Sequence, residues 1–174
     1  MALRHATLIA GLAITLLSTA TWTPVLAQPT GPDIQAQIDA HLRDYPGGVQ
    51  TGPYEITYDK GVFVMTFARS EPTPNGVADC PAGWFCFYDF TNYGYPRGKL
   101  SSCGWQDLSF YGWHDKTESV HYNISTGSVA FINHAAGETG HNFDYAIFGA
   151  GTSQPKIPDT APNRNKADHV ERYC

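Results

Sequence analysis

The chain has 174 residues, of which 42% are hydrophobic, enough apolar material for one packed domain of ordinary size but not for a second large one. Charged residues make up only 16%, against about a quarter in an average globular protein, whereas Gly (17), Pro (12) and Tyr (10) are plentiful. This composition favours strands and turns and excludes coiled coils and long charged helices. The net charge of -5 argues against nucleic acid as a partner, because no basic surface remains to bind phosphates.

Residues 1–27 have the pattern of a secretory signal peptide. Arg4 lies in a short polar start, the stretch from Leu8 to Leu17 is apolar, and small residues then lead to a cleavage position after Ala27. Threonine, serine and proline interrupt the apolar stretch well before the ~20 residues that a membrane-spanning helix needs. We therefore expect a secreted, extracellular protein with no stable membrane association.

Residues 28–79 are expected to form a leader with an amphipathic helix, a β-hairpin and a linker. Apolar residues recur at helical spacing in the first part of this segment: Ile34, Ile38 and Leu42. Residues 54–58 alternate in polarity, Asp59-Lys60-Gly61 predicts a turn, and residues 62–67 are almost entirely apolar, as in a hairpin. Pro and Gly between residues 70 and 77 indicate a linker, which places the boundary of the leader at residue 79.

From residue 80 onward the chain reads as short strands and turns with a weak internal repeat. The aromatic strand pattern of residues 84–88 has a counterpart in residues 129–133, and Asp115-Lys-Thr-Glu-Ser-Val120 is echoed by Asn165-Lys-Ala-Asp-His-Val170. A repeat unit of this size predicts two antiparallel Greek-key motifs that face each other as a β-sandwich. The alternative is chance similarity within a turn-rich, all-β chain.

The sequence has four cysteines, and an even number in an exported protein favours disulfides over free thiols. Four cysteines allow three pairings. Pro and Gly between Cys80 and Cys86 favour a small local loop there, which leaves Cys103 to join Cys174. Zinc ligation is the weaker alternative, because five residues separate the first pair and no second close pair exists.

The stretch from residue 80 to residue 123 resembles a known family. The motifs are Cys80-Pro-Ala-Gly-Trp-Phe-Cys-Phe-Tyr-Asp-Phe-Thr-Asn-Tyr-Gly94, Cys103-Gly-Trp-Gln-Asp-Leu108 and Asp115-Lys-Thr117. They are similar to those of the secreted actinobacterial peptidase inhibitor family typified by a small metalloproteinase inhibitor, whose fold is βγ-crystallin-like. The resemblance implies a mainly β fold, with a βγ-crystallin-like Greek-key sandwich over residues 80–174 preceded by the short helix and hairpin. It also implies binding to a secreted peptidase, of the metalloproteinase type.

In the resembling motif, residues 88–94 fit the folded-back hairpin turn of crystallin domains, where an aromatic side chain packs over the corner. The chain departs from that pattern at Tyr95, where a glycine is usual. The aromatic residues of this region are expected in the core: Trp84, Phe87, Tyr88, Tyr93, Trp105 and Trp113. Two stretches are candidates for an inhibitory loop, residues 90–98 and 149–163, and no matching motif identifies the reactive residues.

Calcium is the one ion that the sequence suggests, because related crystallin domains bind it through a short turn with oxygen ligands. Residues 114–119 and 164–169 match that turn only in part, and Arg164 stands where a ligand is usual in the second. The candidate ligands are Asp115, Ser119, Asn165 and Asp168. The alternative, purely structural interpretation is that these turns only close each motif by hydrogen bonds. No resident cofactor is expected.

No catalytic motif stands out. The six histidines after residue 27 show no metal-binding spacing and are expected to be scattered on the surface. A nucleophile elbow is absent, so the chain is predicted not to be an enzyme. The leading hypothesis is a secreted peptidase-inhibitor-like binding protein, and the alternative is a structural or calcium-stabilised extracellular βγ-crystallin-type protein without a protease target.

Overall fold

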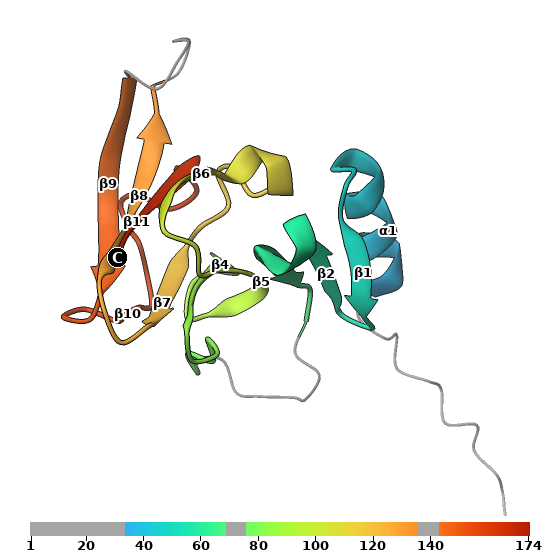
Figure 1. Ribbon diagram of the computed structural model, residues 1–174, viewed down its shortest axis with the longest axis horizontal. Coiled ribbons are helices and arrows are strands. Elements are labelled where there is room, and N and C mark those ends of the chain that lie inside the picture. Colours follow the sequence, from blue (N-terminus) through green and yellow to red (C-terminus); the bar gives the residue numbers. More distant parts are fainter. Residues whose placement is uncertain (1–33, 69–75, 136–142) are drawn as a thin grey trace, which may run out of the picture. The chain divides into compact units, whose positions relative to one another are not determined.

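The computed structural model describes residues 34–68, 76–135 and 143–174, which are coloured in Figure 1. One α-helix, α1 (Ile34–Asp44), precedes eleven strands within these ranges, and two short 3-10 helices lie at Asp59–Gly61 and Leu108–Tyr111. The strands are β1 (Val49–Gly52), β2 (Glu55–Tyr58), β3 (Phe63–Thr66), β4 (Trp84–Phe90), β5 (Gly94–Leu100), β6 (Gly104–Asp107), β7 (Ser119–Asn123), β8 (Ser128–His134), β9 (Asp144–Gly151), β10 (Lys156–Ile157) and β11 (His169–Tyr173). The predicted signal peptide, most of the predicted linker and His141 lie outside the described residues.

Two antiparallel sheets contain all these strands. The long sheet has the order β1-β2-β3-β5-β4-β7-β10, and the short sheet has the order β6-β11-β8-β9. Strands β4 to β7 form the first Greek-key motif and β8 to β11 the second, and each motif gives its third strand, β6 or β10, to the sheet of the other. The mainly β, Greek-key architecture with a preceding helix and hairpin is therefore confirmed.

The core between the sheets is aromatic. Phe87 on β4 contacts Phe131 on β8 edge to face, with ring centroids 6.0 Å apart, and Trp113 edge to face at 5.2 Å. Phe131 in turn stacks on Phe148 of β9 at 4.7 Å. The Trp113 indole is fully buried, and its N–H donates to Thr117 Oγ1 at 3.1 Å, so the buried ring has no unsatisfied polar group.

The aromatic residues predicted for the core divide into three groups. Phe87, Tyr88, Tyr93 and Trp113 are buried, and Trp84 is half-buried against the Cys80–Cys86 region. The prediction was wrong for Trp105, which is 38% exposed on β6 and packs against the ring of His169. Its strand runs along one edge of the short sheet, where a large ring can cover a neighbour without entering the sandwich interior.

The predicted helix and hairpin are present and are joined to the Greek-key region. Ile38 of α1 is fully buried, and Gln35 of α1 exchanges side-chain hydrogen bonds with Gln50 of β1 at 3.0 Å, with α1 alongside β1 in Figure 1. Strand β3 pairs antiparallel with β5, with Phe63 opposite Leu100. The boundary that the sequence suggests at residue 79 is thus crossed by a continuous sheet and a shared core.

Phe63 packs the hairpin against the Greek-key region. Its ring stacks on Tyr111 with centroids 4.2 Å apart and planes 4° from parallel, and it also packs near Phe87 and Trp113. It is fully buried. Removing the ring would leave a cavity between the hairpin and the Greek-key motifs.

We predict that Phe63→Ala lowers the free energy of unfolding by about 3–5 kcal/mol. Because one core spans the hairpin and the sandwich, denaturant unfolding followed by circular dichroism and by tryptophan fluorescence should shift to one common midpoint. Val49→Ala is the control, because Val49 is 63% exposed on β1 and should change stability by less than about 0.5 kcal/mol. A shift in only one of the two signals would show that the hairpin unfolds separately.

Candidate functional site

The two repeated turns meet face to face. The Asp115 N–H donates to the Ala167 carbonyl, and the Asn165 N–H donates to the Thr117 carbonyl, both at 3.1 Å. Asp115 and Asn165 both have a φ of 55°, the left-handed region that Asp and Asn tolerate best among non-glycine residues. The internal repeat in the sequence therefore corresponds to a reciprocal pair of hydrogen bonds between the two Greek-key motifs.

Three of the four predicted calcium ligands lie in crossed pairs around these turns, one of them paired with Glu118. Asn165 lies beside Glu118, with Nδ2 donating to Oε1 at 2.8 Å, while Glu118 Oε2 accepts the Thr91 N–H at 3.2 Å. On the other side, Asp115 lies near Asp168, and burial followed by the charge of Asp168 raises the pKa of Asp115. Each pair thus takes one residue from each motif, which the sequence pattern alone did not indicate.

The remaining predicted ligand, Ser119, is buried and serves the β4–β5 hairpin. Its Oγ donates to the Phe90 carbonyl at 2.7 Å and accepts the Tyr93 N–H at 3.0 Å. Arg164 occupies the position of the second turn where a calcium ligand is usual. Its Nε donates to Asp159 Oδ1 at 2.7 Å. Hydrogen bonding from Arg164 lowers the pKa of Asp159 to about 2. Calcium binding at these turns stays a prediction.

Next to the Asp115–Asp168 pair lies a set of imidazoles and carboxylates, which we call the His–Asp cluster. Its members are Asp107, His114, His134, Asp144, Asp168 and His169. The expectation that the histidines are scattered on the surface was wrong: His41 and His121 are buried elsewhere, and His114, His134 and His169 lie together in this cluster. The strand register brings them together: His169 on β11 lies opposite Asp107 on β6, and His134 on β8 lies opposite Asp144 on β9.

His169 is the centre of the cluster. Its Nδ1 lies 3.6 Å from Asp107 Oδ1 and its Nε2 lies 3.7 Å from Asp144 Oδ1, so the ring stands between two carboxylates. Its side chain is only 6% exposed, and the Trp105 ring packs on it with centroids 4.7 Å apart. Burial lowers the pKa of His169, against the opposing effect of the Asp144 and Asp107 charges.

Each of the two carboxylates also contacts a second histidine. His114 Nε2 lies 2.9 Å from Asp107 Oδ1, and His134 Nδ1 lies 2.7 Å from Asp144 Oδ1. Burial raises the pKa of Asp107, but hydrogen bonds from Ser109 and His114 outweigh it and leave the pKa below its usual value. Among the described residues, two groups could hold a metal ion, and they share one imidazole: the 107–114–169 triad and the 134–144–169 triad.

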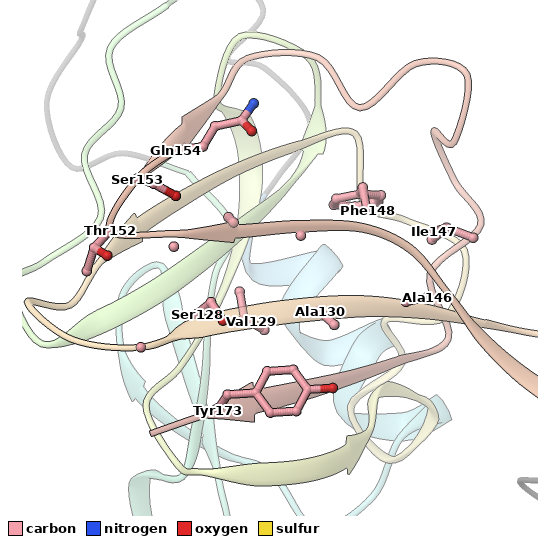
Figure 2. A pocket seen from close by; sticks show the side chains of 14 residues that line it. Ser128, Val129, Ala130, Ala146, Ile147, Phe148, Thr152, Ser153, Gln154 and Tyr173 are labelled. Atoms are coloured by element: carbon pink, nitrogen blue, oxygen red, sulfur yellow. The ribbon is translucent and has the colours of Figure 1, made fainter.

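Elsewhere, a shallow hollow lies over β8 and β9 (Figure 2). Its lining is made of small, apolar and neutral polar side chains, with Ala130, Phe148, Gln154 and Tyr173 among them. No carboxylate, imidazole or thiol lines this hollow, so it offers none of the side chains that usually act as metal ligands or general bases.

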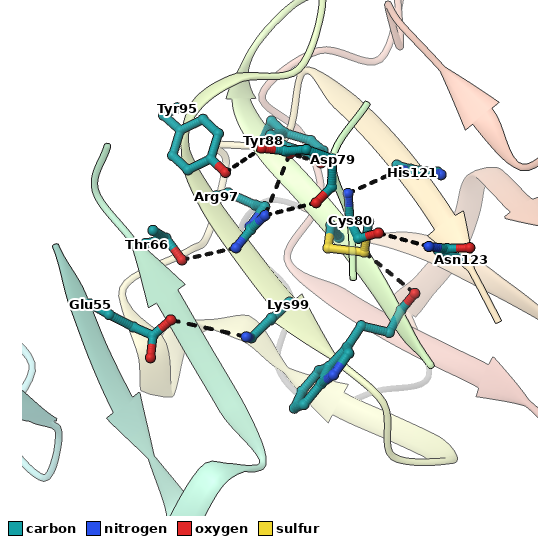
Figure 3. The surroundings of a disulfide bond; sticks show 12 residues. Glu55, Thr66, Asp79, Cys80, Tyr88, Tyr95, Arg97, Lys99, His121 and Asn123 are labelled. Carbon is teal, nitrogen blue, oxygen red and sulfur yellow. Dashed lines mark hydrogen bonds and ion pairs between the residues drawn. A yellow bond between two sulfur atoms is a disulfide. The ribbon is translucent and has the colours of Figure 1, made fainter. Parts of the chain in front are cut away.

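The cysteines form two disulfides, Cys80–Cys86 and Cys103–Cys174, the pairing that the sequence favours. Around the first, Asp79 accepts hydrogen bonds from Tyr88 and Tyr95 at 2.9 and 2.6 Å (Figure 3). The buried Arg97 guanidinium donates to the Asp79 carbonyl at 3.1 Å and to Thr66 of β3 at 3.2 Å. Much of the candidate inhibitory stretch 90–98 is therefore part of β5 and of this network.

The other candidate stretch, residues 149–163, leaves β9 and runs along the first motif. Its backbone is fixed at three points: the carbonyls of Pro155 and Pro158 accept from the N–H groups of Tyr122 and Asn92, and the Thr160 N–H donates to the Glu118 carbonyl. Most side chains between residues 152 and 159 are exposed. The stretch thus presents exposed side chains between residues 152 and 159 on a backbone that is fixed, in part as strand β10, which pairs with β7.

In the part of the chain that is described, no helix is both long enough and apolar enough to cross a membrane.

Comparisons with known proteins give matches among solved structures. No family model and no curated protein matches the chain. Solved structures that resemble it are the N-terminal domain of Protein S (13% identity, 52% of this chain, 94% of that chain, TM-score 0.37) and a mutant of a βγ-crystallin domain from Clostridium beijerinckii (20%, 52%, 97%, 0.36). A third is a βγ-crystallin from Ciona intestinalis (19%, 52%, 100%, 0.36). The strand order itself defines a mainly β fold of two antiparallel sheets with Greek-key motifs.

We predict that Asn165→Ala destabilises the protein by about 1–2 kcal/mol, since alanine is strained at a φ of 55° and cannot donate to Glu118. Asn165→Gly is the matched control: it loses the same hydrogen bond but tolerates the backbone angle, so it should recover part of the loss. Thermal or denaturant unfolding measures both. Equal stability of the two variants would contradict a role for the left-handed turn.

Proposed function

We propose that the protein is a secreted, extracellular βγ-crystallin-type protein that acts as a durable structural or binding module and not as an enzyme. The observation that carries this proposal is the Cys103–Cys174 disulfide, which joins Cys174, just after β11, to Cys103, just before β6, across a sequence separation of 71. Disulfides persist in oxidising environments, which agrees with export.

The disulfides act on the region that forms the two Greek-key motifs. The Cys103–Cys174 bond closes a loop with a sequence separation of 71. In the chain-entropy account, closing a loop of this length removes conformational entropy from the unfolded chain equivalent to about 4 kcal/mol. The Cys80–Cys86 bridge closes a far shorter loop, so it constrains the unfolded chain less. The same bonds leave no cysteine sulfur for nucleophilic catalysis, because all four cysteines of the sequence are paired.

We predict that the double variant Cys103→Ser/Cys174→Ser loses about 2–5 kcal/mol of stability and is digested faster by a broad-specificity protease than the oxidised parent. The matched control, Cys80→Ser/Cys86→Ser, should lose about 2 kcal/mol less, because its loop is short. Unfolding curves and digestion time courses at equal concentration measure both. If both pairs proved neutral, disulfide-based durability would be rejected.

Peptidase inhibition of the metalloproteinase type is the second candidate function, and a secreted peptidase would be its partner. Its support is the loop of residues 152–159, whose side chains are mostly exposed while its backbone is held by hydrogen bonds at Pro155 and Pro158. A pre-organised loop loses little entropy when it enters a protease cleft. The family resemblance of residues 80–123 favours the same function.

For this second function we expect stoichiometric inhibition of a thermolysin-like metalloprotease by the oxidised chain and none of a serine protease. Zinc in excess over the chain ensures that loss of the protease metal does not imitate inhibition. Lys156→Glu, at an exposed position of β10 within this stretch, should weaken inhibition at least about tenfold, whereas Lys60→Glu, the same charge change on the exposed β2–β3 turn, should not. Absence of inhibition would leave the structural module without a protease target.

A further inference from the structure

We propose that Asp107, His114 and His169 bind one divalent transition-metal ion of the zinc class. Imidazole nitrogen and carboxylate oxygen are the ligands that such ions accept, and three protein ligands leave a position open for water. This inference goes beyond the proposed function, because the disulfide-closed core does not depend on a metal.

The separations between the ligand atoms fit a tetrahedral ion. With bonds of about 2.0 Å, two ligands of a tetrahedral zinc lie about 3.3 Å apart. The two separations from Asp107 Oδ1, 2.9 Å to His114 Nε2 and 3.6 Å to His169 Nδ1, lie on either side of that value. The ligand atoms of the triad all lie within 4.8 Å of one another, so small side-chain rotations suffice to admit the ion.

Both histidines of this triad have a carboxylate beside the ring nitrogen that faces away from Asp107. Asp168 Oδ1 lies 3.4 Å from His114 Nδ1, and Asp144 Oδ1 lies 3.7 Å from His169 Nε2. A carboxylate in this position orients the imidazole, fixes its tautomer and makes the ligating nitrogen more basic. The arrangement assigns Asp107 as the ligand and the other two aspartates as positioning residues.

The charges of the cluster favour a cation. The electrostatic neighbours of His169 are Asp144, Asp107, Asp168 and the His114 imidazole, so three carboxylates lie around the two rings. A dication among them reduces the repulsion between these carboxylates. His114 is 39% exposed, which gives an ion access from solvent while His169 remains covered by Trp105.

The 134–144–169 triad is the competing location, and it shares His169. There Asp144 would be the ligand carboxylate, close to His134 at 2.7 Å and to His169 at 3.7 Å. We assign the ion to the 107–114–169 triad because Asp168 and Asp144 stand beside the outer ring nitrogens of its two histidines, and because His114, 39% exposed, is more open to solvent than His134 at 27%.

The test uses the full oxidised chain without a histidine tag, stripped of metal by a chelator and then dialysed. Titration with Zn²⁺ in a calorimeter should give one ion per chain. Titration with Co²⁺ should produce the visible absorption of a four-coordinate ion, which Zn²⁺ then abolishes and Ca²⁺ leaves unchanged. Absence of zinc binding, or displacement of cobalt by calcium at equal concentration, would overturn the proposal.

Matched variants locate the ion. His114→Gln should weaken zinc binding by at least about 100-fold, while His134→Gln, the same substitution in the neighbouring triad, should change it by less than about threefold. Circular dichroism verifies that both are folded, and Asp107→Asn replaces His114→Gln if that variant is not. Loss of binding in His134→Gln with retention in His114→Gln would place the ion in the other triad and reject this assignment.

Discussion

The structure depends on the exchange of strands between the two Greek-key motifs. Each motif leaves its third strand, β6 or β10, in the sheet of the other, so neither sheet is complete without both motifs. The reciprocal hydrogen bonds of Asp115 and Asn165 join the two motifs at their repeated turns and so stabilise this exchange. The aromatic core between Phe87 and Phe131 then has two covering sheets, and burial of these rings supplies the main stabilisation.

The helix and hairpin extend the same principle to the edge of the long sheet. Without β3, strand β5 would present unpaired N–H and C=O groups, which invite association with other chains. The hairpin covers this edge and places Phe63 against Tyr111, so edge protection and core packing come from one element. Arg97 of β5 adds a polar link from Thr66 of β3 to Asp79, next to the first disulfide.

Much of this could be predicted from local patterns, because each involves residues close in sequence. The helix over residues 34–44, the β2–β3 hairpin and the aromatic strand β4 agree with helical spacing, a turn signal and alternation. The pairing of β3 with β5 could not be predicted in this way, because strand register depends on residues distant along the chain. Trp105 was misplaced for a related reason: aromatic character predicts burial, but only the position of β6 at a sheet edge exposes the ring.

The His–Asp cluster was missed because no two of its histidines show metal-binding spacing in sequence. Its assembly follows from the register of β11. Val170 is fully buried in the core, and since neighbouring residues of a strand point to opposite faces, His169 is directed to the outer face. There the pairing of β11 with β6 places it opposite Asp107, while β8 brings His134 to the same end of the sheet. A slip of β11 by one residue would move Val170 out of the core, so the packing that stabilises the sandwich also holds the cluster together.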